Sequence, residues 1–272
     1  MAASGKPQVI AVASGKGGVG KTNLAGNLAV TFSQMKKNVL IFDADLGLAN
    51  LDVLFGLAPR KNIRQVIEGR TPLRDIIIKG PNGISILPAA SGVAELAEGQ
   101  PAYLEGLANE IQALASEYDV LLIDAPPGIG TNVRKFSALA DELLVVTTPE
   151  PTAVTDAYAL VKVMRRENPN LPMRLIVNMA TDLAEAERVA SAFSEVTMRF
   201  LGMPMPSLGG LPWDDHLSDA VRRQMPVVTC HPNCRASRCL LGLGRTLLKT
   251  PAHQGEDTLP AFHNRILRWM KK

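Results

Sequence analysis

The sequence predicts an α/β fold, a doubly wound, mostly parallel sheet with helices on both faces. Short apolar runs recur along the chain, as expected for buried parallel strands. Most of these runs are separated by amphipathic stretches of helical length, an order that places a helix between successive parallel strands. With 272 residues, 46% of them hydrophobic, the chain is long enough to bury such a core.

The first predicted strand, residues 9–13, is a β-branched run that leads through glycines into a helical pattern at 22–35. Further strands are expected at 38–42, 84–87, 120–123, 143–147, 175–178 and 208–211. Further helices are expected at 103–116, 156–166 and 183–200. Together these elements predict one domain over residues 1–248.

Two shorter segments are expected to follow this domain. Residues 249–258 mix proline, glycine, histidine and acidic residues without periodicity, as a linker does, and residues 259–272 form an amphipathic helix. Its apolar arc holds Leu259, Phe262, Ile266, Leu267, Trp269 and Met270, and its basic face holds Arg265, Arg268, Lys271 and Lys272. We expect Phe262, Ile266, Leu267, Trp269 and Met270 to enter an anionic membrane surface as a reversible anchor. The alternative is a helix docked on the protein itself or on a partner subunit.

Composition excludes several classes of protein. A net charge of +3 is too small to mark an obligate nucleic-acid binder. Three cysteines, an odd number, argue against a disulfide framework and favour a reducing, cytoplasmic location. No stretch approaches the ~20 consecutive apolar residues of a membrane span, and no secretory leader is apparent.

A phosphate-binding loop follows the first strand and opens the first helix. It consists of Gly15, Lys16, Gly17, Gly18, Val19, Gly20, Lys21 and Thr22, which match G-x-x-x-x-G-K-[ST]. The glycines let backbone N–H groups wrap around phosphates, and the helix N-terminus adds positive partial charge. Lys21 is expected to reach the β and γ phosphates of ATP, and Thr22 to offer its hydroxyl to Mg²⁺.

A turn that follows a buried strand adds a carboxylate to the predicted site. The strand at 120–123 is followed by Asp124 and by the stiff turn 125–130, Ala-Pro-Pro-Gly-Ile-Gly. Asp124 is expected to be a partner of Mg²⁺, directly or through water, and the turn to sense the γ-phosphate. The alternative role for this carboxylate is to cap the segment that follows.

Lys16 adds a feature that the general motif does not require. Together with Asp43-Ala44-Asp45 after the second strand, it resembles the deviant Walker A ATPases of the ParA/MinD family. The resemblance implies that Lys16 reaches the partner's nucleotide in an ATP homodimer, and that Asp45 orients the attacking water. It also implies that Asn178 and Pro212 contact adenine, although Asn178 could instead cap a helix.

Within that family the chain is similar to the MinD-like flagellar number regulators of the FlhG/FleN type. The likeness covers 43–57, 66–69, 88–92 and 150–160 besides the phosphate loop. It implies slow, dimer-dependent ATP hydrolysis and control of flagellar number or placement. The implied partners are a flagellar transcriptional activator and the GTPase FlhF. Residues 1–8 are too short for the FlhF-stimulating motif of some members, and 229–234 departs from the usual family sequence.

Two alternatives stay open at this stage. One is a DNA- or cargo-partitioning ATPase of the ParA type, and the other is a division-site MinD. Arg222, Arg223, Arg235, Arg238 and Arg245 could form a DNA-binding patch, although charged runs more often form solvated faces.

The spacing of the cysteines favours reduced thiols over a metal site. Cys230, Cys234 and Cys239 with His231 could ligate a metal, but they lack the paired C-x-x-C spacing of strong zinc or cluster sites. Reduced, partly buried thiols are therefore expected.

Overall fold

The computed structural model describes residues 7–45, 50–61, 65–66, 68–88, 110, 113–249 and 265. Its strands are β1 Gln8–Ala13, β2 Val39–Asp43, β3 Ile78–Lys79, β4 Ser85–Leu87, β5 Val120–Asp124, β6 Glu142–Thr147, β7 Met173–Ala180 and β8 Ser207–Pro212. Its α-helices are α1 Lys21–Gln34, α2 Leu51–Leu54, α6 Thr131–Ser137, α7 Pro151–Glu167, α8 Leu183–Leu201, α9 Asp215–Arg222, α10 Val227–Cys230 and α11 Arg235–Lys249. Two short 3₁₀ turns, η1 Leu73–Ile76 and η2 Pro81–Gly83, flank β3.

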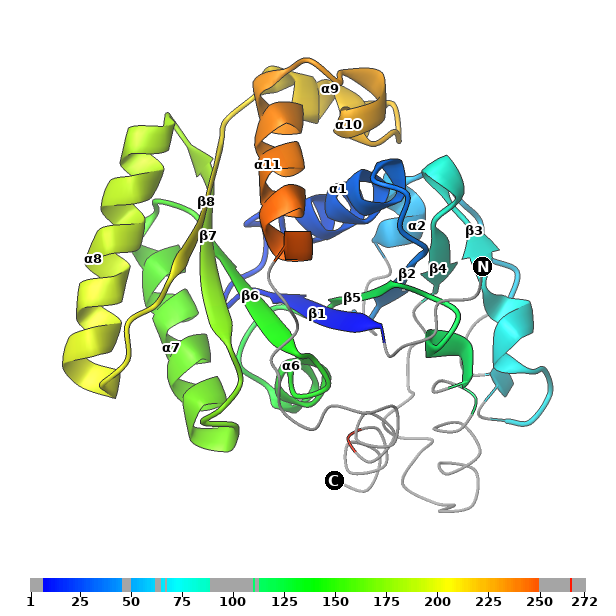
Figure 1. Ribbon diagram of the computed structural model, residues 1–272, viewed down its shortest axis with the longest axis horizontal. Coiled ribbons are helices and arrows are strands. Elements are labelled where there is room, and N and C mark those ends of the chain that lie inside the picture. Colours follow the sequence, from blue (N-terminus) through cyan, green and yellow to red (C-terminus); the bar gives the residue numbers. More distant parts are fainter. Residues whose placement is uncertain are drawn as a thin grey trace.

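The strands form one sheet in the order β3-β4-β2-β5-β1-β6-β7-β8 (Figure 1). Every pairing is parallel except that of β3 with β4 at the edge. The predicted fold class is confirmed, and each predicted strand corresponds to a strand of the sheet. The predicted helix at 103–116 lies mostly outside the described residues, as does the terminal helix at 259–272 apart from Arg265.

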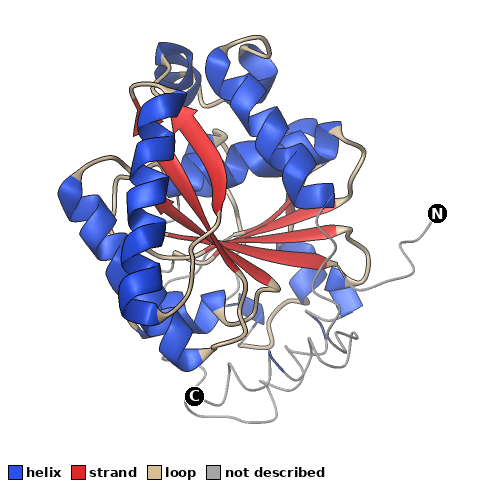
Figure 2. Cartoon of the chain, turned by 60° about the vertical axis from the view of Figure 1, so that its left-hand side comes forward, coloured by secondary structure: helices blue, strands red, loops and turns tan. Residues whose placement is uncertain are grey.

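Alternate side chains of the central strand β1 enter two separate cores. Ile10 and Val12 pack on the face covered by α1, α10 and α11, whereas Val9 and Ala11 pack on the face covered by α6, α7 and α8. Figure 2 shows these helices on either side of the strands. Because strands buried on both faces need apolar side chains at every position, they read as continuous hydrophobic runs in the sequence.

Helix α11 closes the α1 face of the sheet and was not among the predicted helices. Leu240, Leu243 and Leu247 are buried at helical spacing. Gly244 allows the close approach to α1, because a Cβ atom there would lie 2.9 Å from the Thr31 Cγ2 atom. Glycines at 242 and 244 weaken the helical signal in the sequence, although the leucine spacing carries it.

The strand order places the predicted site at the carboxyl ends of the central strands. β2, β5 and β1 are neighbours, so their carboxyl ends bring together Asp43, Asp124 and the loop 14–20. In open parallel sheets, ligands bind outside the carboxyl ends of the strands. Within the described ranges, no helix combines the length and apolar character that crossing a membrane requires.

Candidate nucleotide-binding site

The loop between β1 and α1 has a backbone that depends on glycine. Gly18 and Gly20 both have φ of 81°, in the left-handed region. Gly15 packs against α7 so closely that a Cβ atom would lie 2.0 Å from the Asp156 carbonyl oxygen. These contacts fix the loop at the N-terminus of α1, where helical N–H groups favour phosphate.

Lys21 and Asp124 form a buried ion pair beneath this loop. The Lys21 Nζ atom lies 2.5 Å from the Asp124 Oδ1 atom, and their side chains are 7% and 0% exposed. Burial raises the pKa of Asp124, and the Lys21 ammonium opposes that rise. The Asp124 Oδ2 atom has no hydrogen-bond partner within the described part of the chain. Thr22 lies beside this carboxylate, since a hydrogen bond from its side chain also lowers the pKa of Asp124.

Asp43 organises the segment that carries Asp45. Its Oδ1 atom accepts a hydrogen bond from the Asp45 N–H at 3.1 Å, and its Oδ2 atom accepts from the Asn50 and Leu51 N–H groups at 3.1 and 3.2 Å. Burial and the nearby charge of Asp124 raise the pKa of Asp43 to about 6, and these hydrogen bonds oppose the rise. Sequence reasoning gave Asp43 no role of its own, although its place at the end of a buried strand was a usable signal.

Lys16 lies at the surface and is bound within its own subunit. Its Nζ atom donates to the Glu150 Oε2 atom and to the Thr152 Oγ1 atom, each at 3.1 Å. The Lys16 and Glu150 side chains are 40% and 67% exposed. Glu150 directly precedes α7, so the signature lysine is held at the start of that helix. An ion pair this exposed is weak and easily exchanged for another partner.

Asn178 braces the phosphate loop from β7. Its buried Nδ2 atom donates to the Val19 carbonyl oxygen at 2.8 Å, and it lies where a Cβ atom on Gly20 would clash. Pro212 is buried at the end of β8 and pairs in register with Ala180. Asn178 thus lies beside the phosphate loop and Pro212 at the carboxyl end of the neighbouring strand, and the contact of either with adenine stays a prediction.

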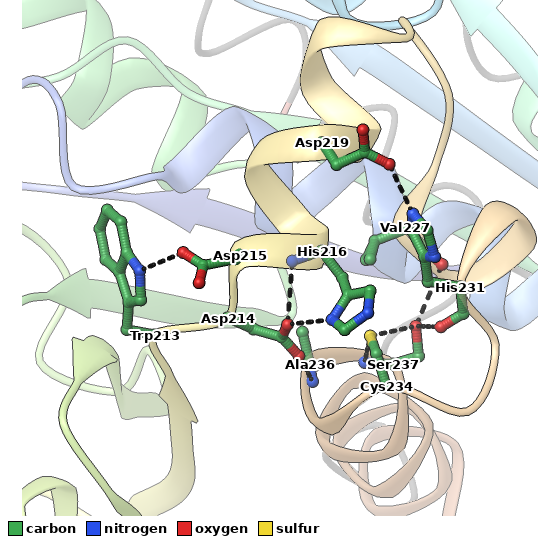
Figure 3. A network of polar contacts seen from close by, with 10 residues as sticks. All are labelled: Trp213, Asp214, Asp215, His216, Asp219, Val227, His231, Cys234, Ala236 and Ser237. Carbon is green, nitrogen blue, oxygen red and sulfur yellow. Dashed lines mark hydrogen bonds and ion pairs between the residues drawn. The ribbon is translucent and has the colours of Figure 1, made fainter.

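A polar network joins the end of β8 to α9, α10 and α11 (Figure 3). The Asp214 carboxylate accepts from the His216 and Ala236 N–H groups at 3.0 and 2.9 Å and contacts the His216 ring at 2.8 Å. Burial raises the pKa of Asp214, but these hydrogen bonds outweigh burial and lower it to about 2. Asp219 contacts the His231 ring at 2.7 Å, and the two imidazole centroids lie 4.7 Å apart. The network thus ties α9, α10 and α11 to the end of β8.

The three cysteines lie beside this network as free thiols. Burial raises the pKa of the Cys230 and Cys239 thiols. Cys234 accepts a hydrogen bond from the Ser237 N–H at 3.4 Å. Among the residues that the structure describes, no three His, Cys, Asp or Glu side chains are grouped to hold a metal ion. The metal-site alternative therefore has no geometric support in these ranges.

The arginine patch and the basic C-terminal segment are the two basic features predicted outside the nucleotide site. The five arginines of the possible DNA patch are exposed on α9, directly after it and on α11, and Arg223 contacts Asp219 at 2.9 Å. Arg265 is only 17% exposed, and its guanidinium contacts the Asp141 Oδ1 atom at 2.8 Å. The expected membrane residues Phe262, Ile266, Leu267, Trp269 and Met270 lie outside the described residues.

Comparison with known proteins decides the family. A family profile described as ParA, "NUBPL iron-transfer P-loop NTPase", matches residues 6–248. The chain is 42% identical to the antiactivator FleN of Pseudomonas aeruginosa over 230 residues, which are 85% of this chain and 82% of that protein. The chain belongs to the ParA/MinD family of P-loop NTPases.

Other members of the family match along most of the chain. The flagellum site-determining protein YlxH of Helicobacter pylori is 32% identical over 98% of this chain and 92% of its own length. The solved MinD of Pyrococcus horikoshii, complexed with Mg-ADP, has a TM-score of 0.73 at 25% identity, covering 89% of this chain and 96% of that one. The ParA/MinD residues gathered here fit a magnesium nucleotide, because the buried Asp124 Oδ2 atom finds no hydrogen-bond partner among the described residues and lies beside a glycine-shaped phosphate loop.

Proposed function

We propose that this protein is an ATP-dependent dimerising switch that regulates flagellar number or placement. The likeness to FleN carries the proposal, and the likeness to YlxH supports it. In this proposal ATP assembles the homodimer that binds the partners, and hydrolysis to ADP resets the monomer. The division-site MinD alternative draws on a weaker likeness, 31% identity to the MinD of Bacillus subtilis.

Each residue of the nucleotide site has a separate role in this proposal. The loop 15–22 and Lys21 bind the triphosphate, and Thr22 and Asp124 hold Mg²⁺, which supplies charge neutralisation at the β and γ phosphates. Asp45 orients the attacking water. The hydrogen bond that the Asp43 carboxylate accepts from the Asp45 N–H sets the position of Asp45. Slow turnover follows because the site lacks the partner's Lys16 until a dimer forms.

Partner choice separates this proposal from its alternatives. The Asp45→Ala protein loaded with ATP is expected to retain the purified flagellar transcriptional activator, because hydrolysis no longer ends the partner-binding state. The Lys16→Ala protein with ATP is the matched control, since it is expected to bind nucleotide without dimerising. A pulldown compares the two with the activator, the GTPase FlhF, a cell-division inhibitor and random DNA. Retention of the division inhibitor or of DNA in place of the activator contradicts the flagellar assignment.

The C-terminal segment gives a second prediction, on membrane binding. One amphipathic helix binds lipid weakly, whereas two in an ATP dimer bind more tightly through effective concentration. We therefore expect the full-length protein to sediment with anionic liposomes in ATP more than in ADP, and a version ending at Thr258 not to sediment. The contact of Arg265 with Asp141 supports the docked-helix alternative for the state described here. Equal sedimentation of the two versions in ATP contradicts the anchor.

A further inference from the structure

A cavity lies at the end of the sheet where β2 begins, opposite to the carboxyl ends of the strands that hold the phosphate loop. It has a volume of about 470 Å³ and opens between the end of α1, the start of β2, the β3–β4 turn and the segment before β5. It is lined by Ser33, Lys36, Lys37, Asn38, Val39, Lys79, Asn82, Gly83, Ser85, Glu117 and Tyr118. Since α1 has 14 residues, this cavity is separated from the phosphate loop by a helix about 20 Å long.

The charges that line this cavity are predominantly positive. Lys36, Lys37 and Lys79 contribute three ammonium groups, and Glu117 is its lining carboxylate. Glu117 is already engaged, since Arg74 donates to both of its carboxylate oxygens. Among the described residues, no hydrogen bond or ion pair occupies the Lys36 or Lys37 ammonium, and Lys79 donates to the Ser85 hydroxyl at 2.9 Å. Most of this positive charge is thus available to a ligand.

The walls of the cavity are held in place by contacts between separate elements. The Ser33 hydroxyl donates to the Asn82 carbonyl oxygen at 2.7 Å, which ties α1 to the β3–β4 turn. The Thr229 hydroxyl contacts the Asn82 Oδ1 atom at 3.3 Å, which ties that turn to α10. Figure 1 shows the β3–β4 edge beside the end of α1. A ligand would therefore meet a largely preformed site.

Two lining residues also have a left-handed backbone conformation, which asparagine tolerates and lysine rarely adopts. Lys36 has φ of 65° just past the C-cap residue of α1, where glycine is the usual residue, and Asn82 has φ of 53°. The left-handed conformation is costly for a lysine, and such conformations gather at functional sites. Helix stability alone would favour glycine at position 36, so the lysine there places an ammonium group beside the cavity at a cost in stability.

We propose that this cavity binds a small ligand carrying two adjacent phosphate groups. Three ammonium groups match the charge of a pyrophosphate unit, and the volume lies in the range of small-molecule sites. The Ser85 hydroxyl, which accepts from Lys79 and keeps its own proton, and the side-chain amide of Asn38 suit the remaining oxygens. The Ser33 hydroxyl and the Asn38 backbone N–H already donate to Asn82 and Asp119. The phosphate loop is a separate site, so the proposal does not rest on the flagellar assignment.

Equilibrium dialysis of labelled pyrophosphate tests the proposal on full-length protein saturated with Mg-ADP, so that the phosphate loop is already filled. One saturable pyrophosphate per chain is expected, with weaker binding of inorganic phosphate. Lys36→Gly should weaken pyrophosphate binding roughly tenfold through loss of a charged contact. The same change should raise the thermal midpoint, because glycine suits the left-handed backbone. Loss of binding then cannot be attributed to loss of the fold.

A charge-matched pair of variants separates a built site from general attraction. Lys37→Gln/Lys79→Gln should lose binding, whereas Lys162→Gln/Lys249→Gln, which removes exposed lysines outside the cavity, should bind as the unmodified protein does. Absence of saturable binding at millimolar pyrophosphate overturns the proposal. So does an equal loss in both double variants, which would indicate nonspecific charge attraction.

Discussion

The Lys21→Ala protein is expected to lose ATP binding and about 3 kcal/mol of its free energy of unfolding. Binding should be lost because, in the proposed mechanism, this ammonium meets the β and γ phosphates. Stability falls because the carboxylate of Asp124, 0% exposed, is left without its partner. Isothermal titration with ATP measures the first effect, and urea denaturation measures the second.

The double variant Lys21→Ala/Asp124→Asn separates these two effects. Removing the buried negative charge together with its partner should restore most of the stability, because no uncompensated charge remains. ATP binding should stay absent, since no lysine reaches the phosphates. A Lys21→Ala protein that binds ATP as the unmodified protein does would contradict the assigned role of this lysine.

The Lys16→Ala protein is expected to bind ATP normally and to fail to form a dimer. Lys16 contacts Glu150 and Thr152 of its own subunit through an exposed pair, which contributes at most about 1 kcal/mol and is easily released. The lysine is then free to neutralise charge on the partner's nucleotide, as the ParA/MinD resemblance implies. Nucleotide titration and sedimentation in ATP measure the two properties separately.

Glu150→Gln is the matched control for this lysine. It removes the intrasubunit ion pair and keeps the ammonium of Lys16, so its ATP dimer should form at least as readily as that of the unmodified protein. A Lys16→Ala protein that dimerises normally would show that the dimer does not depend on the signature lysine.

Much of the fold could be predicted because parallel strands buried on both faces need uninterrupted apolar runs. The two-residue strand β3 could not, since it is too short for any periodicity. Helix α7 begins at Pro151, earlier than the predicted residue 156, because proline suits the first helical position. Helix α6, with seven residues, is likewise too short for a clear amphipathic pattern.

The site was predictable where it depends on local sequence and less so where it depends on distant contacts. The phosphate loop, Lys21 and Asp124 follow from motif and strand position. The hydrogen bond from Asn178 to Val19 joins residues 159 positions apart, which no local pattern reveals. The same holds for the contact of Lys16 with Glu150, which depends on how α7 packs against the loop.

The mass of the Asp45→Ala protein in saturating ATP and in ADP, measured by sedimentation equilibrium, tests the switch most directly. In the proposed mechanism Asp45 orients the attacking water, so without it ATP should persist while its binding contacts remain. The account predicts a stable dimer in ATP, a monomer in ADP and loss of phosphate release. An Asp45→Ala protein that binds ATP, no longer hydrolyses it and yet remains a monomer would contradict the account.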